Sequence, residues 1–237
     1  MNLTVIRRPL VRARRAVFEA LGSDRYSRPA LHDLDRKLER HLDFAGGFFL
    51  EAGANDGVAQ SNTYYFERRR GWSGILIEPI PELAAQCRVQ RKRSVVVEAA
   101  LVAPDFAGDG IEMQFAGLMS VVEGAFGDAA RRQRHVAMGL AQRDVAGTYA
   151  VRVKARTLSD VISEHGGGRE LDLLSLDVEG AELPALRGLD LARHAPRYVC
   201  IEAREPAAVA ALLGTRYERA EVLSDNGTHQ DLLFRRR

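Results

Sequence analysis

The chain has 237 residues, of which 46% are hydrophobic and 28% charged, the composition of an ordinary globular protein with one substantial core. Its 34 lysines and arginines against 32 aspartates and glutamates leave a net charge of +2, so we expect no nucleic-acid partner. No apolar run reaches the length of about 18 residues that a membrane-spanning helix needs. The two cysteines, Cys87 and Cys200, have neither metal-type nor redox-type spacing, which favours a reduced, cytoplasmic setting.

The amino-terminal segment is basic and interleaved with apolar residues. It lacks the apolar core and cleavage site of a signal peptide, and the arginines that precede its first acid, Glu19, are Arg7, Arg8, Arg12, Arg14 and Arg15. We expect a helical extension over residues 1–46, followed by one domain over 47–237. Three partners stay open for the first helix: an anionic membrane surface, its own domain, or the second subunit of a homodimer. A second helix is predicted over 31–43, where Leu31, Leu34, Leu38 and Leu42 recur at helical spacing.

A buried-strand pattern over 48–52 breaks at once into a glycine-bounded turn. Parallel strands buried on both faces are short apolar runs, and ligands of open α/β sheets bind at the carboxyl ends of such strands. Gly53 and Gly57 allow backbone conformations and close approaches that a side chain would block. The spacing departs from the dinucleotide fingerprint Gly-x-Gly-x-x-Gly, because Asn55 and Val58 stand where glycines belong. It matches instead the first motif of S-adenosylmethionine-dependent methyltransferases.

A helix is predicted near 60–70, ending before Gly71. A second strand is predicted over 74–78 and ends in an acid, Glu78. An acid at the end of the second strand of a βαβ unit is placed to accept hydrogen bonds from ribose hydroxyls. A helix over 81–92 follows, since Pro81 suits a first-turn position. The third strand is Ser94–Val97. The two strand ends together predict a nucleoside ligand.

A long insertion separates the third strand from the fourth. Residues 111–115 and 151–155 alternate like strands, residues 128–143 are polar and predict a helix, and Thr157 predicts a capped helix start. We expect the insertion near 105–150, with residues 118–120, to form the acceptor side of the site.

The carboxyl-terminal part predicts two more parallel strands and a hairpin. Strand four covers 171–176 and delivers Asp177, Glu179 and Glu182 at its end; strand five covers 198–202 and ends in Glu202. Residues 217–223 and 231–235 predict the hairpin. The alternation of strands and helices predicts an α/β fold with a mostly parallel sheet and crossover helices.

These blocks, taken together, resemble the FkbM family of S-adenosylmethionine-dependent methyltransferases. The resemblance covers roughly residues 47–233 and rests on Glu51 to Gly57 with Ser61-Asn62-Thr63, Gly74 to Pro79, Leu118-Met119-Ser120, Asp177-Val178-Glu179-Gly180-Ala181-Glu182 and His229-x-Asp231. It implies a Rossmann-like methyltransferase fold with a mostly parallel seven-stranded sheet and a carboxyl-terminal antiparallel hairpin. It also implies methyl transfer, usually to an oxygen of a sugar, glycolipid or natural product, so the partner is a small-molecule or glycan acceptor.

We expect S-adenosylmethionine at the carboxyl edge of strands one to three. Glu51 and the turn 53–57 would hold its methionine portion, Glu78 its ribose and residues 98–100 its adenine. The full predicted cofactor-binding set is Glu51, Gly53, Asn55, Asp56, Gly57, Asn62, Glu78, Pro79, Ala99, Ala100 and Asp177.

Transfer to a hydroxyl requires removal of its proton, by a base or by a metal that lowers its pKa. We expect Asp177 to be the base, with His229 as the alternative and Mg²⁺ held by Asp177 and Glu202 as a third route. Two other functions stay open: a nicotinamide-dependent oxidoreductase and a noncatalytic nucleoside-binding module.

Overall fold

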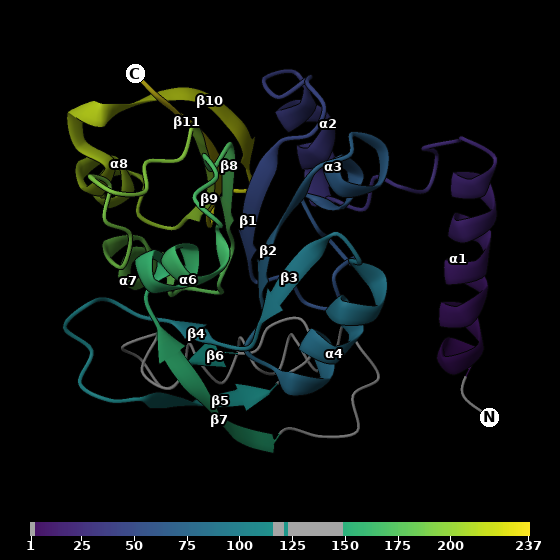
Figure 1. Ribbon diagram of the computed structural model, residues 1–237, viewed down its shortest axis with the longest axis horizontal. Helices are drawn as coiled ribbons and strands as arrows, with labels where there is room; N and C mark the ends of the chain where they lie inside the picture. The colour runs from purple at the N-terminus through teal and green to yellow at the C-terminus, as the bar shows by residue number, and fades with distance from the viewer. Residues whose placement is uncertain (1–2, 116–120, 123–148) are drawn as a thin grey trace.

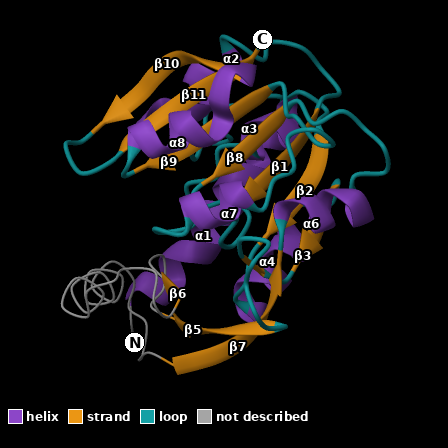
Figure 2. Cartoon of the chain, turned by 90° about the vertical axis from the view of Figure 1, so that its left-hand side faces the viewer, coloured by secondary structure: helices purple, strands orange, loops and turns teal. Residues whose placement is uncertain are grey.

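The computed structural model describes residues 3–115, 121–122 and 149–237 (Figures 1 and 2). Its main sheet has seven strands: β1 (Phe48–Ala52), β2 (Ser73–Ile77), β3 (Ser94–Val97), β8 (Leu173–Leu176), β9 (Tyr198–Ala203), β10 (Tyr217–Asp225) and β11 (Gln230–Arg236). Their order across the sheet is β10-β11-β9-β8-β1-β2-β3. β11 runs antiparallel to both β9 and β10, and the other neighbours are parallel. The predicted mostly parallel seven-stranded sheet and its carboxyl-terminal hairpin are confirmed.

The central strand, β1, explains why the sequence around it is apolar without alternation. All five of its residues are buried. It pairs with β2 on one side and β8 on the other, so that Leu50 lies between Ile75 and Leu174. A strand with neighbours on both sides and helices on both faces has no solvent-facing side chains.

Two layers of helices cover the sheet. Side chains from α2, α3 and α4 pack in one buried cluster with Phe49 and Leu76, whereas α6, α7 and α8 pack in another with Leu50 and Ile75. The chain is therefore a three-layer α/β sandwich. The helices are α2 (Leu34–Glu39), α3 (Tyr64–Arg69), α4 (Pro81–Gln90), α6 (Leu158–His165), α7 (Glu182–Arg187) and α8 (Pro206–Leu213), with short 3₁₀ turns η1 (Leu31–Asp33) and η3 (Gly214–Arg216).

Several helix boundaries differ from the prediction. The helix expected over 31–43 is split, because His32 and Asp33 have φ values of 52° and 55° and interrupt it. The helix expected near 60–70 begins only at Tyr64, since the preceding residues form a loop tied to β1. The capped start at Thr157 is confirmed: its side chain accepts a hydrogen bond from the Asp160 amide at 3.1 Å.

A second, smaller sheet lies beyond the carboxyl edge of the main sheet (Figure 1). Its order is β4-β7-β5-β6, and the predicted strands near 111–115 and 151–155 are its β5 and β7. The predicted helix over 128–143 and the block at 118–120 lie outside the described residues. The bounds of the small sheet are β4 (Ala100–Leu101), β5 (Gly110–Phe115), β6 (Val121–Val122) and β7 (Tyr149–Arg156).

The amino-terminal helix α1 (Leu3–Ala20) stands beside α3 and α4, outside the two covering layers (Figure 1). Within the parts of the chain that are described, no helix combines the length and hydropathy needed to cross a membrane. The domain boundary at residue 46 stays a prediction. Leu34, Leu38 and Leu42 belong to the core cluster of α3 and α4, which joins the second half of the predicted extension to the domain.

Candidate active site

An open pocket lies at the carboxyl edge of the main sheet, where the chain order changes direction between β1 and β8. Such switch points are where open α/β sheets bind ligands. The pocket and the open solvent at its mouth together have a volume of about 810 Å³. It is lined by Gly53, Asn55, Ala59, Gln60, Ile77, Glu78, Pro79, Leu83, Ala99, Ala100, Leu101, Met113, Asp177, Val178, Glu179 and Ala181. Residues that follow β1, β2, β3 and β8 thus converge on one space.

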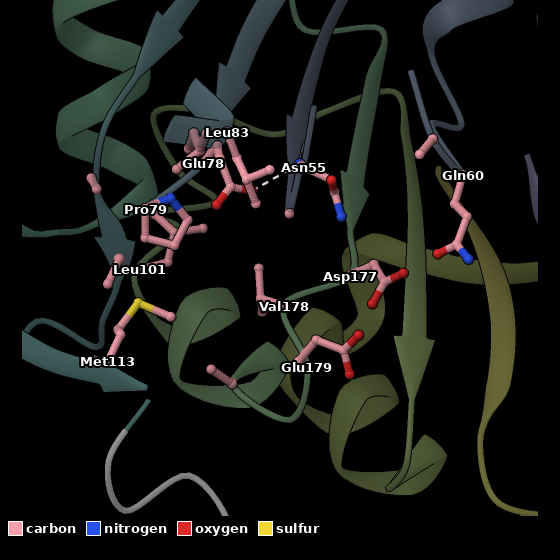
Figure 3. A pocket seen from close by; sticks show the side chains of 16 residues that line it. Asn55, Gln60, Glu78, Pro79, Leu83, Leu101, Met113, Asp177, Val178 and Glu179 are labelled. Atoms are coloured by element: carbon pink, nitrogen blue, oxygen red, sulfur yellow. Dashed lines mark hydrogen bonds between the residues drawn. The ribbon is translucent and has the colours of Figure 1, made fainter. Parts of the chain in front are cut away.

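The two walls of the pocket differ in chemistry (Figure 3). Pro79, Leu101 and Met113 form one side, and Asp177 and Glu179 lie across from them. Met113 comes from β5, so the small sheet contributes to the apolar side.

Gly53 allows the ends of β1 and β8 to meet. Its φ is +85°, and a Cβ at this position would lie 1.8 Å from the backbone oxygen of Asp177. No side chain fits in that space, so glycine is required for this approach of the two strand ends.

Glu78 is held rigidly at the pocket wall. One of its oxygens accepts a hydrogen bond from the Asn55 amide at 2.8 Å and the other from the Ile80 amide at 2.9 Å. The side chain is buried. The acid at the end of β2 therefore also fixes the turn that follows β1.

Glu51 does not line the pocket. Its side chain accepts hydrogen bonds from the Ser61 hydroxyl at 2.8 Å, the Asn62 amide at 2.8 Å and the Thr63 hydroxyl at 2.6 Å. In the pleat it shares a face with Phe49, which packs among α2, α3 and α4 rather than toward the pocket. Its place in the structure is a clasp for the loop between β1 and α3.

Arg91 completes this clasp and was missed by the sequence reasoning. It is fully buried and donates to the Gly57 carbonyl at 3.0 Å and the Thr63 hydroxyl at 2.8 Å. Its guanidinium lies 3.4 Å from Glu51 and 2.9 Å from Glu67. An arginine at the end of a helix is typical of the protein surface, so nothing in the local pattern could have revealed its partners.

Two further carboxylates, Glu182 and Glu202, lie close to Asp177 behind the acidic side of the pocket. Asp177, Glu182 and Glu202 each offer an oxygen, and these oxygens lie within 4.8 Å of one another. Arg204 lies 3.6 Å from Glu179 and 3.4 Å from Glu202, and it offsets part of the negative charge. The strand-end rule correctly brought Asp177 and Glu202 together, since β8 and β9 are parallel neighbours.

This crowding changes proton affinities. Desolvation by the surrounding protein, followed by the charges of Glu202 and Glu179, raises the pKa of Asp177 well above its usual value. The side chain is nevertheless open to the pocket. Burial, with Glu179 and Glu182 next, raises the pKa of Glu202 to about 8, against an opposing effect of Arg204. The carboxyl group best placed to face a ligand therefore has a strengthened affinity for a proton.

The three carboxylates are the group in the described ranges that has the chemistry to hold a divalent cation. Two of the three, Glu182 and Glu202, already have polar partners. Glu182 accepts hydrogen bonds from the Val178 and Gly180 amides at 3.1 and 2.9 Å, and Glu202 lies 3.5 Å from His229.

Other predicted residues lie next to the pocket rather than in its lining. Asp56 caps its own turn by accepting from the Val58 and Ala59 amides, at 3.0 and 2.7 Å. Gly57 lies against Arg91, and Asn62 is buried with its amide group donating to Ser175 at 3.1 Å. His229 lies 3.5 Å from Glu202, which is one of the three clustered carboxylates.

Three pocket residues have strained backbones. Asn55, Gln60 and Glu179 have φ values of 53°, 62° and 55°, in the left-handed region that non-glycine residues seldom adopt. Such strain concentrates at ligand sites, where the surrounding structure enforces it. Gln60 is a pocket residue that the sequence analysis missed, because no spacing rule singles it out.

The methyltransferase FkbM domain model matches residues 51–218. This is well over half of the chain. The chain belongs to the FkbM family of S-adenosylmethionine-dependent methyltransferases. The matched segment begins at Glu51 and contains every pocket-lining residue named above. A search of curated proteins gave no match.

Several solved methyltransferase structures are similar to this chain at low sequence identity. Methyltransferase FkbM from Methylobacillus flagellatus KT is 14% identical with a TM-score of 0.45, over 81% of this chain and 43% of that one. A TehB-like SAM-dependent methyltransferase from Corynebacterium glutamicum is 14% identical with a TM-score of 0.42, over 100% of both chains. The 1,6-didemethyltoxoflavin-N1-methyltransferase from Burkholderia thailandensis is 13% identical with a TM-score of 0.41, over 100% of this chain and 91% of that one. The chain thus spans less than half of the Methylobacillus FkbM protein.

The buried clasp generates a stability prediction. Arg91→Met should lower the free energy of unfolding by about 3–5 kcal/mol, because it leaves Glu51 and Glu67 as buried carboxylates without their cation. Urea unfolding followed by circular dichroism measures the change. The matched control is Arg88→Met on the same helix, whose ion pair with Glu98 is largely exposed and should contribute at most about 1 kcal/mol. Equal losses in the two variants would contradict the clasp.

Proposed function

We propose that this chain is an S-adenosylmethionine-dependent O-methyltransferase that acts on a hydroxyl of a sugar, glycolipid or natural product. The observation that carries the proposal is the charge of the pocket. Among its described lining residues, Glu78, Asp177 and Glu179 are acids and none is a lysine or arginine. Such a pocket suits a cationic sulfonium nucleoside and opposes a pyrophosphate.

The backbone also argues against a nicotinamide cofactor. Dinucleotide folds start a helix directly after the glycine turn, so that its amino terminus meets the pyrophosphate. Here β1 ends at Ala52 and α3 begins only at Tyr64, with the clasped loop between them. Pyrophosphate would find no helix terminus at this turn, and no lysine or arginine is among the described residues that line the pocket.

The pocket residues fit an adenosyl ligand by their donors and acceptors. Glu78 is an acceptor held by two backbone amides at the end of β2, which suits the hydroxyls of a ribose. Ile77, Pro79 and Leu83 provide apolar surface for an adenine, next to Ala99 and Ala100. The turn at Gly53 and Asn55 would hold the methionine portion. The clasp at Glu51 would act on this site only by holding the loop.

The bound sulfonium supplies an activated methyl group, so the protein has mainly to align the acceptor oxygen, exclude water and remove a proton. Asp177 is placed for proton removal because β8 delivers it to the acidic side of the pocket and its neighbours raise its proton affinity. Met113 and Leu101 border the space left for the acceptor. His229 and a metal at Asp177 and Glu202 stay as the competing routes.

Cofactor binding is tested at Glu78. Glu78→Ala should weaken binding of S-adenosylhomocysteine by roughly 10- to 100-fold, because hydrogen bonds to a charged group contribute about 1.5–3 kcal/mol each. Isothermal titration calorimetry measures the affinity. Glu112→Gln, an exposed acid beside Met113, is the control and should bind like wild type. Unchanged affinity in Glu78→Ala, with a normal thermal melt, would rule out the ribose contact.

Methyl transfer is tested with methyl-labelled S-adenosylmethionine and a panel of glycosides, glycolipids and phenols, with amines as the competing acceptor class. Label should appear on a hydroxyl acceptor and be absent with Asp177→Asn. Label on amines alone would contradict O-methylation, and cofactor binding without any transfer would favour a binding module.

The pH profile of that transfer separates the three routes. Asp177 must be ionised to accept a proton, and its pKa is raised, so the rate should rise with pH above the ordinary carboxyl range. Glu202→Gln removes a negative neighbour and should move this rise to lower pH. A pH-dependent rise that vanishes in His229→Ala would assign the base to His229 instead. Loss of activity with EDTA and recovery with Mg²⁺ would assign a metal.

A further inference from the structure

Helix α1 makes a set of polar contacts with the domain. The centre of these contacts is Glu19, whose side chain is only 5% exposed. It accepts hydrogen bonds from the Ser27 hydroxyl at 2.9 Å, the Tyr64 hydroxyl at 2.9 Å and the Arg68 guanidinium at 2.7 Å. Arg12 and Arg15 reach Gln86 and Gln90 of α4 at 3.2 and 3.3 Å. The side of the helix that carries Arg12, Arg15 and Glu19 therefore faces the protein.

The apolar side of α1 faces outward. Leu10 and Val17 are 64% and 56% exposed, and Leu21, directly after the helix, is 78% exposed. Positions 10, 17 and 21 differ by seven and four residues, so they lie along one stripe of the helical surface. An isolated exposed leucine is ordinary, but a stripe of branched side chains turned away from its own core indicates a partner.

The charge of the segment selects among partners. Residues 1–20 contain five arginines and one glutamate as their charged side chains, an excess of four positive charges. Pairing of this face with the same face of a second copy would bring two such helices together, and their charges would repel. An anionic lipid surface offers an apolar layer for the stripe, and its negative headgroups attract the net positive charge of the segment.

We propose that α1 is a membrane-surface helix that docks this chain on anionic bilayers, with Leu10, Val17 and Leu21 inserted into the headgroup boundary. Binding would lie in the plane of the interface and be reversible, since one short apolar stripe contributes only a marginal affinity. Arg12 of the same helix lies 4.0 Å from Asp56 in the turn after β1, so docking would hold the pocket region close to the lipid surface. Docking of this kind favours a glycolipid among the acceptor classes. This last step alone rests on the proposed function.

Co-sedimentation of the full chain with vesicles tests the docking without any assay of activity. The chain should sediment with phosphatidylcholine vesicles that contain phosphatidylglycerol, not with phosphatidylcholine alone, and the binding should weaken in high salt. Leu10→Glu combined with Val17→Glu should reduce the bound fraction by roughly tenfold or more. The reason is that these two branched side chains, once inserted into the bilayer, contribute most of the apolar part of the binding free energy. Val222→Glu, at a valine that is 42% exposed on β10, is the control and should bind like wild type.

Three results would overturn the proposal. The first is no sedimentation with anionic vesicles, and the second is equal sedimentation of wild type and the double variant. The third is a dimer in sedimentation velocity that the double variant dissociates, which would assign the stripe to a second copy of the chain. If the double variant has an altered thermal melt, Leu21→Ser gives the same comparison at a position outside the helix.

Discussion

The loop between β1 and α3 depends on a buried carboxylate and a buried guanidinium. Glu51 accepts hydrogen bonds from three consecutive residues of that loop, and Arg91 joins Glu51 to the Gly57 carbonyl and to Glu67. Burying these charges is costly, and such a group is retained when every member is satisfied and one arrangement is enforced. Because the loop is held from beneath, Gly53 and Asn55 can present backbone to the pocket without a helix to support them.

The pocket lies at the end of the same strand, β1, but in the described part of the chain its carboxylates are not balanced by a buried arginine as Glu51 is. Its acids are brought together by strand order: β1 and β8 are neighbours, β9 lies beside β8, and each ends near a carboxylate. Desolvation by the surrounding protein, and then the neighbouring carboxylates, raise the pKa of Asp177, which makes it a stronger base than an ordinary aspartate. The negative charge of the pocket would attract a cationic cofactor and repel a pyrophosphate. The cofactor preference and the proposed base thus have one physical origin.

Much of the fold could be predicted from the sequence. Short apolar runs bounded by turns placed β1 and β3 at the residues observed, and the rule that parallel strands end at one edge brought Glu78, Gly53 and Asp177 to one pocket. What could not be predicted depends on partners distant in sequence. Glu51 ends the same kind of run as Glu78, yet the pleat turns it toward α3 and Arg91, whereas Glu78 lies beyond its strand and faces the pocket. Two strands of the small sheet, β5 and β7, were predicted, but their pairing with β4 was not, because β4 has two residues and no pattern of its own.

The central claim is that this pocket binds an adenosyl sulfonium nucleoside. Calorimetric titration of the unmodified chain with S-adenosylmethionine and, separately, with NAD tests it most directly. The account predicts saturable binding of S-adenosylmethionine at one site per chain and no saturable heat with NAD, because the lining carboxylates and the absence of a helix start at the turn disfavour pyrophosphate. Saturable binding of NAD, with none of S-adenosylmethionine, would contradict it.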